Sequence, residues 1–248
     1  MPRLSRENKL RRLEEIAAEF DTSKDFDAVM AYYDVLEIRK HLIGKRVLEM
    51  GSSAGTVTKY LLSHSRQLDI VEATTIGIER TKRNMGGKVH LVNFHQSLWE
   101  EFEPNEEYTD IVFVRGLEHV EDPPWLLSRI REWLTTNGRI HIIVPNAYSL
   151  SRIVMYYNGE IQDIHELVER DFKVGHLRVY DKNMLEKDIV SANLGITYLN
   201  GFFVKAIRTS DFGKITMDPN HILVRQAYAM GLKYPAIGHQ LYAMAERT

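Results

Sequence analysis

The chain has 248 residues, of which 44% are hydrophobic and 27% charged, and its formal net charge is −2. This length allows one large domain or two small ones, and the composition is that of an ordinary globular protein. The small net charge gives no basic field for nucleic acid or anionic membrane, and no run reaches the roughly 18 apolar residues of a membrane span. Cysteine is absent, which excludes disulfides and thiolate sites. The charged start lacks the apolar core of a signal peptide, so we expect a cytoplasmic protein.

Helical patterns come first in the chain. The stretch from near Ser23 to Gly44 predicts a helix within a helical N-terminal part. Short runs rich in Val and Ile then alternate with helical segments, as in a parallel sheet buried on both faces. The expected strands are 46–50, 68–73, 89–94, 110–114 and 139–144, and the expected helices are 55–64, 77–85 and 123–136. This alternation predicts a doubly wound α/β domain.

The regular alternation breaks after residue 145. Residues 146–180 are polar and aromatic, and such long insertions are usually functional or disordered, so we expect substrate recognition there. A helix with Asp181 as its cap and Gly195 at its end comes next. Strands at 196–204 and 241–246 follow, with a helix near 219–233 between them. We expect one domain over 1–248, made of a helical lid (1–44), a cofactor-binding core (45–145), a substrate insertion (146–180) and the C-terminal part of the sheet (181–248).

The stretch "KRVLEMGSSAG" at 45–55 runs from a strand into a turn of small residues. A P-loop is excluded, because Gly55 is followed by Thr56 and Val57 instead of Lys and Ser or Thr. A dinucleotide fingerprint fails at Ser53 and Thr56, which leaves a nicotinamide oxidoreductase as a distant alternative. The remaining pattern, an acid at Glu49 in E-x-G-x-x-x-G, resembles motif I of class I S-adenosylmethionine-dependent methyltransferases. The fuller family motif has another glycine where this chain has Ser53.

Later segments carry the same resemblance in the same order. Glu72 closes the second strand run, where an acid about 20 residues beyond the turn accepts hydrogen bonds from ribose hydroxyls. "VRGLEHVEDP" at 114–123 closely resembles the segment after strand four of many small-molecule methyltransferases, and "GRIHIIVPN" at 138–146 is like the strand that follows. The later "PNAYSLSR" and "GHLRVYDKNML" look like bacterial relatives that modify sugars or secondary metabolites. The resemblance implies a Rossmann-like seven-stranded sheet whose last strand is antiparallel.

The resemblance also implies a cofactor, S-adenosylmethionine, and a product, S-adenosylhomocysteine. Glu49 would hold the ammonium group of the cofactor, and Tyr33 would belong to the lid. The chain offers Gln96 or Ser97 where relatives commonly place an acid near the adenine, and Trp99 is either core or adenine wall. The expected cofactor-binding residues are Glu49, Gly51, Ser52, Ser53, Gly55, Glu72, Ala73, Ser97, Leu98, Arg115, Gly116 and Tyr33.

His119, just past the fourth strand, is the candidate general base, and the alternative is that it orders the 118–122 loop. His176, Arg178 and Tyr180 alternate in "GHLRVY", so an extended chain would project all three to one side, with Arg178 toward a carboxylate or phosphate. The alternative is a loop ordered by its own hydrogen bonds. The expected substrate-binding residues are Tyr32, Asn146, Tyr148, His176, Arg178 and Tyr180.

No histidine and carboxylate spacing resembles a metal signature, so we expect no metal. "DPPW" at 122–125 imitates the signature of DNA amino-methyltransferases but stands some eight residues beyond the strand, and Asp122 and Pro123 are explained as a helix start. We therefore predict an O- or N-methyltransferase for a sugar, nucleotide sugar or natural-product intermediate, with no nucleic-acid or membrane partner. A peptide acceptor and a non-catalytic cofactor-binding scaffold are the alternatives, and a homodimer is left open.

Overall fold

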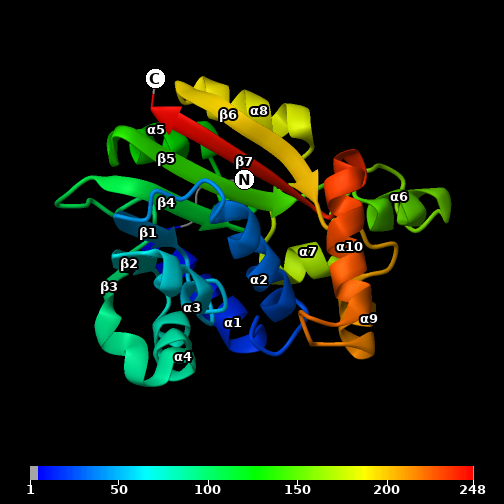
Figure 1. Ribbon diagram of the computed structural model, residues 1–248, viewed down its shortest axis with the longest axis horizontal. Helices are drawn as coiled ribbons and strands as arrows, with labels where there is room; N and C mark the ends of the chain where they lie inside the picture. Colours follow the sequence, from blue (N-terminus) through cyan, green and yellow to red (C-terminus); the bar gives the residue numbers. More distant parts are fainter. Residues whose placement is uncertain (1–4, 248) are drawn as a thin grey trace.

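Seven strands form one mixed sheet in the computed structural model, which describes residues 5–247 (Figure 1). The strands are β1 (Arg46–Met50), β2 (Gln67–Glu72), β3 (Val92–Gln96), β4 (Tyr108–Val114), β5 (Leu134–Pro145), β6 (Leu194–Phe202) and β7 (Gln240–Arg247). Their order is β3-β2-β1-β4-β5-β7-β6, and β7 runs antiparallel to both of its neighbours. This arrangement confirms the predicted seven-stranded, Rossmann-like sheet.

Helices cover both faces of the sheet, so the central strands are buried on both sides and read as continuous apolar runs. One face packs against α5 (Pro123–Glu132) and α8 (Lys182–Ser191). The other packs against α2 (Asp27–Ile38), α3 (Thr58–Leu61) and α10 (Ile222–Lys233). One cluster of buried apolar side chains lies on each face of the sheet. The first includes Leu126, Ile130 and Ile189, and the second includes Met30, Val35 and Val224.

Most of the remaining elements lie around the carboxyl ends of the strands or at the sheet's β3 end. They are α1 (Arg6–Glu19), α4 (Thr75–Met85), α6 (Leu150–Tyr157), α7 (Glu169–Val174) and α9 (Thr209–Ile215), with 3₁₀ turns at Leu62–His64, Gly86–Leu91, Leu117–His119 and Pro235–Ile237. The helix α1 packs on α4 in the lower part of Figure 1, and α6 and α7 form the insertion after β5. The 146–180 insertion therefore contains two short helices.

Capping explains where two helices begin. The Asp122 carboxylate accepts from the Trp125 N–H at 3.1 Å, with Pro123 in the first turn, and the Asp181 carboxylate accepts from the Met184 N–H at 2.7 Å. Both starts confirm the sequence prediction.

Several predicted boundaries were wrong. The third strand begins at Val92, because residues 86–91 form a 3₁₀ helix. The helix after Asp122 ends at Glu132, because the chain turns at once into β5, where Leu134 pairs with Tyr108. Gly138 consequently lies inside β5, and Gly195 lies inside β6, so neither glycine marks a helix end.

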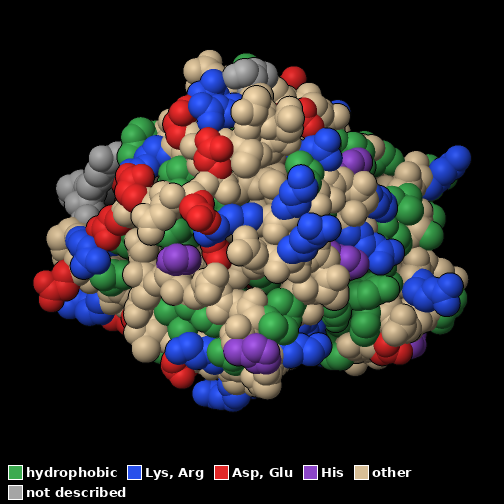
Figure 2. Space-filling model, turned by 60° about the vertical axis from the view of Figure 1, so that its left-hand side comes forward, with side chains coloured by type: hydrophobic (Ala, Val, Ile, Leu, Met, Phe, Trp, Pro, Cys, Tyr) green, Lys and Arg blue, Asp and Glu red, His purple; other side chains and the backbone are tan. Residues whose placement is uncertain are grey.

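Within residues 5–247, no helix has the length and apolar character that crossing a bilayer requires. Acidic and basic side chains are interspersed on the face of the molecule that Figure 2 shows. This mixture matches the small net charge of −2.

Candidate functional site

A cavity of about 750 Å³ lies at the carboxyl ends of the parallel strands, the edge at which open α/β sheets bind ligands. Its walls come from the segments after β1, β2, β3, β4 and β5, from the insertion, from the chain before α9 and the first turn of that helix, and from the start of β7. The helix α1 closes one side with the apolar side chains of Leu13, Ile16 and Ala17, and Phe20 follows directly. The cavity therefore joins the predicted cofactor turn to the predicted substrate insertion.

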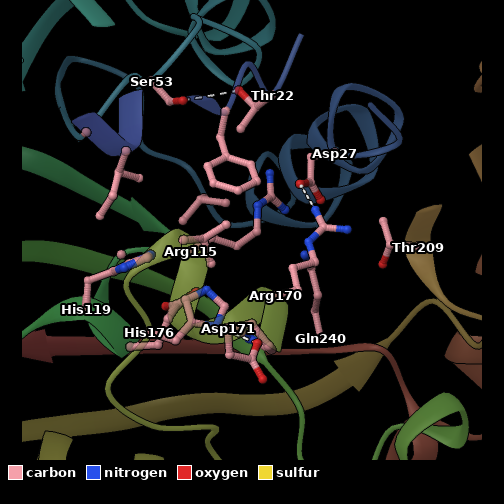
Figure 3. Close-up of a pocket in the computed structure, with 18 of the residues that line it drawn as sticks. Thr22, Asp27, Ser53, Arg115, His119, Arg170, Asp171, His176, Thr209 and Gln240 are labelled. Atoms are coloured by element: carbon pink, nitrogen blue, oxygen red, sulfur yellow. Dashed lines mark hydrogen bonds and ion pairs between the residues drawn. The ribbon is translucent and has the colours of Figure 1, made fainter. Parts of the chain in front are cut away.

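The turn after β1 is narrow because its residues adopt unusual backbone angles. Gly51 has φ +82°, and a Cβ at this position would lie 2.9 Å from the Trp99 ring. A side chain here would therefore strain the backbone and clash with Trp99. Ser53 also has a positive φ, +51°, at the position where the fuller motif has glycine. Its hydroxyl lies 3.3 Å from that of Thr22 (Figure 3). Ser53 thus adopts the left-handed backbone conformation that glycine favours.

Glu72 holds this turn in place. Its Oε2 accepts hydrogen bonds from the backbone N–H groups of Ser52 and Ser53, both at 3.0 Å. Its Oε1 accepts from the Thr74 N–H at 2.9 Å and from the Thr74 hydroxyl at 2.7 Å. Four donors occupy the roughly four acceptor positions of a carboxylate. Sequence reasoning missed this clamp, and the ribose contact of Glu72 stays a prediction.

Glu49 is a buried acid in the cavity wall, with 2% of its surface exposed. Burial raises its pKa to about 8, although the hydroxyl of Thr58, which donates to Oε2 at 2.7 Å, acts in the opposite direction. A cation next to the carboxylate would favour its charged form. The site is therefore suited to an ammonium group.

Arg115 links the exit of β4 to α2. It has φ +50°, and its guanidinium contacts the fully buried Asp34 at 2.5 Å. Gln240, with its amide nitrogen toward Asp34 and its oxygen toward Arg115, completes the group. Gly116 follows, where a Cβ would lie 2.0 Å from the Phe113 ring, so this position has no room for a side chain.

Two histidines and two acids gather at the next bend. The Nδ1 of His176 lies 2.9 Å from Asp171 Oδ1, and its Nε2 lies 3.8 Å from Glu118 Oε1 (Figure 3 shows the first pair). The Nδ1 of His119 lies 3.2 Å from the Gly175 carbonyl, and the two imidazole centroids are 4.8 Å apart. The Glu118 carboxylate is fully buried, and neither of its oxygens has a hydrogen-bond partner among the described residues.

The two histidines differ in basicity. Burial lowers the pKa of His119 to about 3, so this ring is neutral and a weak base. Burial also opposes protonation of His176, but the hydrogen bond to Asp171 and the charge of Glu118 outweigh it and raise the pKa of His176 above its usual value. His176 is therefore the stronger base of the pair.

Glu118, His119 and His176 also form a group that could hold a metal ion, since one ligand atom from each lies within 4.8 Å of the others. If both Nδ1 atoms are protonated, each donates to an oxygen and leaves Nε2 free, which is the usual state of a metal-bound histidine. The expected absence of a metal stays a prediction.

The cavity brings together most of the predicted cofactor residues. Those that line it are Glu49, Gly51, Ser52, Ser53, Glu72, Ala73, Leu98, Arg115 and Gly116. Three others lie outside its lining. Gly55 packs against Thr81 of α4, and Ser97 donates its hydroxyl to the Leu98 carbonyl. Tyr33 is buried and donates to the Pro219 carbonyl at 2.7 Å, so it joins α2 to the chain before α10.

The predicted catalytic residue and two of the predicted substrate residues, His119, His176 and Asn146, line the cavity, and four do not. Tyr32 packs edge-on against Tyr60, and half-exposed Tyr148 lies against His165. Arg178 and Tyr180 stand apart because Arg178 donates to the carbonyls of residues 117, 120 and 121, and buried Tyr180 donates to Asp188. The "GHLRVY" stretch thus follows the open alternative of a segment ordered by hydrogen bonds, except at His176.

Sequence reasoning missed several cavity residues that come from distant segments. They are Glu118, Arg152, Arg170, Asp171, Lys205, Arg208, His239 and Gln240. A signal existed for Lys205, a lysine directly after the apolar run that ends the predicted 196–204 strand. Arg170 and Asp171 lie on α7, a six-residue helix with no clear pattern of its own.

Comparisons with known proteins show the family to which the chain belongs. Residues 6–199 match the family described as "Methyltransferase domain". The chain belongs to this family. No curated protein matches the chain. The family match and the shared fold confirm the predicted class I S-adenosylmethionine-dependent methyltransferase.

Solved methyltransferase structures share the fold at low sequence identity. The DhpI–SAM–HEP complex aligns with a TM-score of 0.62 at 14% identity, over 98% of this chain and 100% of DhpI. The N-methyltransferase NodS from Bradyrhizobium japonicum WM9, in complex with S-adenosyl-L-homocysteine, gives 0.60 at 13%, over 96% and 97%. The CcbJ methyltransferase from Streptomyces caelestis gives 0.59 at 12%, over 94% and 95%.

Proposed function

We propose that this methyltransferase uses S-adenosylmethionine to methylate an oxygen or nitrogen of a small polar molecule, such as a sugar, nucleotide sugar or natural-product intermediate. The observation that supports it most is that the Gly51 turn, Glu72 and the Asp171–His176 pair line the same cavity. The DhpI structure is a complex with S-adenosylmethionine, and the NodS structure is a complex with S-adenosyl-L-homocysteine.

The residues present fit the cofactor. Glu49, a buried acid with a raised pKa, would hold its ammonium group, and the backbone of Gly51 and Ser52 would lie along its chain. Ala73 and Leu98 would line the base, and Glu72 would hold the turn beside the cofactor through its hydrogen bonds to Ser52 and Ser53. When bound, the cofactor supplies an electrophilic methyl group on a sulfonium that leaves as a neutral thioether.

The protein's own residues then position the acceptor and take its proton. His176 Nε2 receives the proton of an acceptor hydroxyl, and Asp171 holds the ring through Nδ1 and stabilises the imidazolium that forms. This assignment replaces the sequence hypothesis that His119 is the base, because burial leaves His119 with a pKa of about 3. His119 instead supports the His176 ring and the turn at Gly175.

Glu118 and α1 complete the site. The Glu118 oxygens have no partner among the described residues, so they can accept hydrogen bonds from an acceptor hydroxyl or amine. Leu13 and Ile16 of α1, with Phe20 just after it, exclude water from the same space. An amine acceptor would need only to be neutral, so it would depend less on His176.

The test has two stages. Calorimetric titration with S-adenosylhomocysteine first measures whether the full chain binds the cofactor product, and we expect a micromolar dissociation constant. Release of S-adenosylhomocysteine is then followed with a panel of sugars, sugar nucleotides, amines and short peptides. Turnover on a small molecule supports the proposal, turnover only on peptides supports the peptide alternative, and binding without any turnover supports the scaffold alternative.

A further inference from the structure

Lys205 is a buried lysine in the wall of the cavity, on the side formed by the chain after β6. Only 4% of its surface is exposed, and its ammonium group donates to the Ile207 carbonyl at 3.0 Å. Arg170 of α7 and Arg208 before α9 line the same cavity. Three basic residues from two distant segments therefore line one cavity.

These cations are not equally neutralised. Arg170 lies 3.2 Å from Asp27 and 3.5 Å from Asp25, and Arg208 pairs with Glu160. In the part of the chain that the structure describes, no carboxylate lies within the 4.0 Å ion-pair distance of the Lys205 ammonium. A buried ammonium without a counter-ion is costly, so proteins usually pair it or use it.

His239 adds a second observation on this side of the cavity. Its Nδ1 is buried and has no hydrogen-bond partner among residues 5–247, and its Nε2 lies 3.5 Å from the Thr209 hydroxyl. Burial, followed by the charges of Lys205, Arg115 and Arg170, lowers the pKa of His239 well below its usual value. The ring is therefore neutral and can offer an N–H to an anion.

The electrostatic surroundings of Lys205 agree with an anion site. Burial and the nearby Arg170 lower its pKa to about 7, and Asp27 and Asp211 only partly oppose this. The site is thus short of negative charge, and an oxyanion would satisfy the ammonium and the His239 ring together.

We infer that Lys205, with Arg170, Arg208 and His239, binds an oxyanion group of the methyl acceptor, a carboxylate or a phosphate-type group. This inference deepens the proposed function and rests on it. It moves to Lys205 the role that the sequence suggested for Arg178, whose guanidinium is taken up by backbone carbonyls. Acceptors would then carry the anion at one end and the hydroxyl or amine near His176 at the other.

The test uses the full chain saturated with S-adenosylhomocysteine, with inorganic phosphate and acetate as separate probes. Carbon-13 labelling of lysine side chains gives an NMR resonance for Lys205, identified by its loss in Lys205→Met. We expect the preferred anion to raise the pKa of Lys205 by about one pH unit or more. Calorimetry should show at least about tenfold weaker binding of that anion in Lys205→Met, with Lys205→Arg between the two.

Lys214→Met is the matched control, because Lys214 lies on α9 near this side, is 76% exposed and pairs with Asp211. It should leave anion binding unchanged. The tighter of the two probes identifies a phosphate-type or a carboxylate acceptor, and either result supports the inference. The change in pKa is read in the wild-type protein, and Lys205→Arg also removes the lysine resonance, so the assignment does not depend on the folding of Lys205→Met alone.

Three results would overturn the inference. They are no response of Lys205 to either anion, equal anion binding in wild type and Lys205→Met, and weaker S-adenosylhomocysteine binding in Lys205→Met. The last result would assign Lys205 to the cofactor instead. Failure of the wild type to bind S-adenosylhomocysteine contradicts the proposed function itself, so the two failures are distinguishable.

Discussion

Asp171 Oδ1 lies 2.9 Å from His176 Nδ1, and the same aspartate accepts from the Val168 N–H through its other oxygen at 3.0 Å. The acid is thus fixed by the start of α7 before it orients the imidazole. The partners are five positions apart in the sequence, and the chain between them makes a left-handed turn at Gly175, with φ +84°. A short helix and one glycine therefore place the His176 imidazole in the cavity wall.

This pair predicts the pH dependence of catalysis. With a hydroxyl acceptor, His176→Asn should lower kcat by about 10²–10⁴-fold, because the proposed proton acceptor is removed. The wild-type rate should rise with pH through the pKa of His176, which lies above the ordinary 6.5. Asp171→Asn should move that midpoint to lower pH. His119→Asn is the comparison variant, and a larger loss there than in His176→Asn would restore His119 as the base.

Glu49 predicts proton release when the cofactor product binds. Its carboxyl, with a pKa of about 8, is mostly protonated at pH 7, and an adjacent ammonium would favour the charged form. Calorimetry with S-adenosylhomocysteine in buffers of different ionisation enthalpy should show release approaching one proton. Glu49→Gln should abolish the release, while Glu103→Gln, 74% exposed outside the cavity, should not. Equal proton release in Glu49→Gln would show that another group loses the proton.

The sequence contained enough to predict the sheet and the turn, because those features are local. Apolar runs indicate strands. Glu49 and Glu72 lie at the ends of β1 and β2, and Gly51 directly follows β1, so the sheet brings all three to one edge. The acid–histidine pair and the Lys205 group could not be assembled in this way. Their positions depend on how α7 and the chain after β6 pack, which no short pattern specifies. Arg178 is an example. The alternation of residues in the sequence suggested that it contacts substrate, but in the folded chain its guanidinium donates to backbone carbonyls.

Gly51 and Gly87 provide a matched pair for testing the turn. Gly51→Ala places a Cβ at φ +82° and 2.9 Å from Trp99, so it should cost about 1–2 kcal/mol of unfolding free energy from the backbone alone and weaken cofactor-product binding. A Cβ at Gly87 meets nothing within 4 Å, so Gly87→Ala should change neither quantity. Urea unfolding and calorimetry measure both. Unchanged binding in Gly51→Ala would remove this turn from the cofactor site.

Tyr33 separates a structural role from the predicted lid role. Its hydroxyl donates to the Pro219 carbonyl at 2.7 Å, and its ring packs against Tyr228. Tyr33→Phe should therefore lower the unfolding free energy by about 0.5–1.5 kcal/mol. Binding of S-adenosylhomocysteine should stay within about twofold of wild type. A tenfold loss of affinity with unchanged stability would instead return Tyr33 to the cofactor site.

The Asp171–His176 pair also predicts how stability depends on pH. The pKa of His176 is raised in the folded state, so the stabilisation from its protonated form is fully present below pH 6.5 and is lost as pH rises through the folded pKa. A double-mutant cycle with Asp171→Asn and His176→Asn measures the coupling by urea unfolding. We expect about 1.5–3 kcal/mol at pH 6, as for a charged hydrogen bond, and about 0.5–1.5 kcal/mol at pH 9. A coupling that is equal or larger at pH 9 would contradict the raised pKa, and with it the choice of His176 as the stronger base.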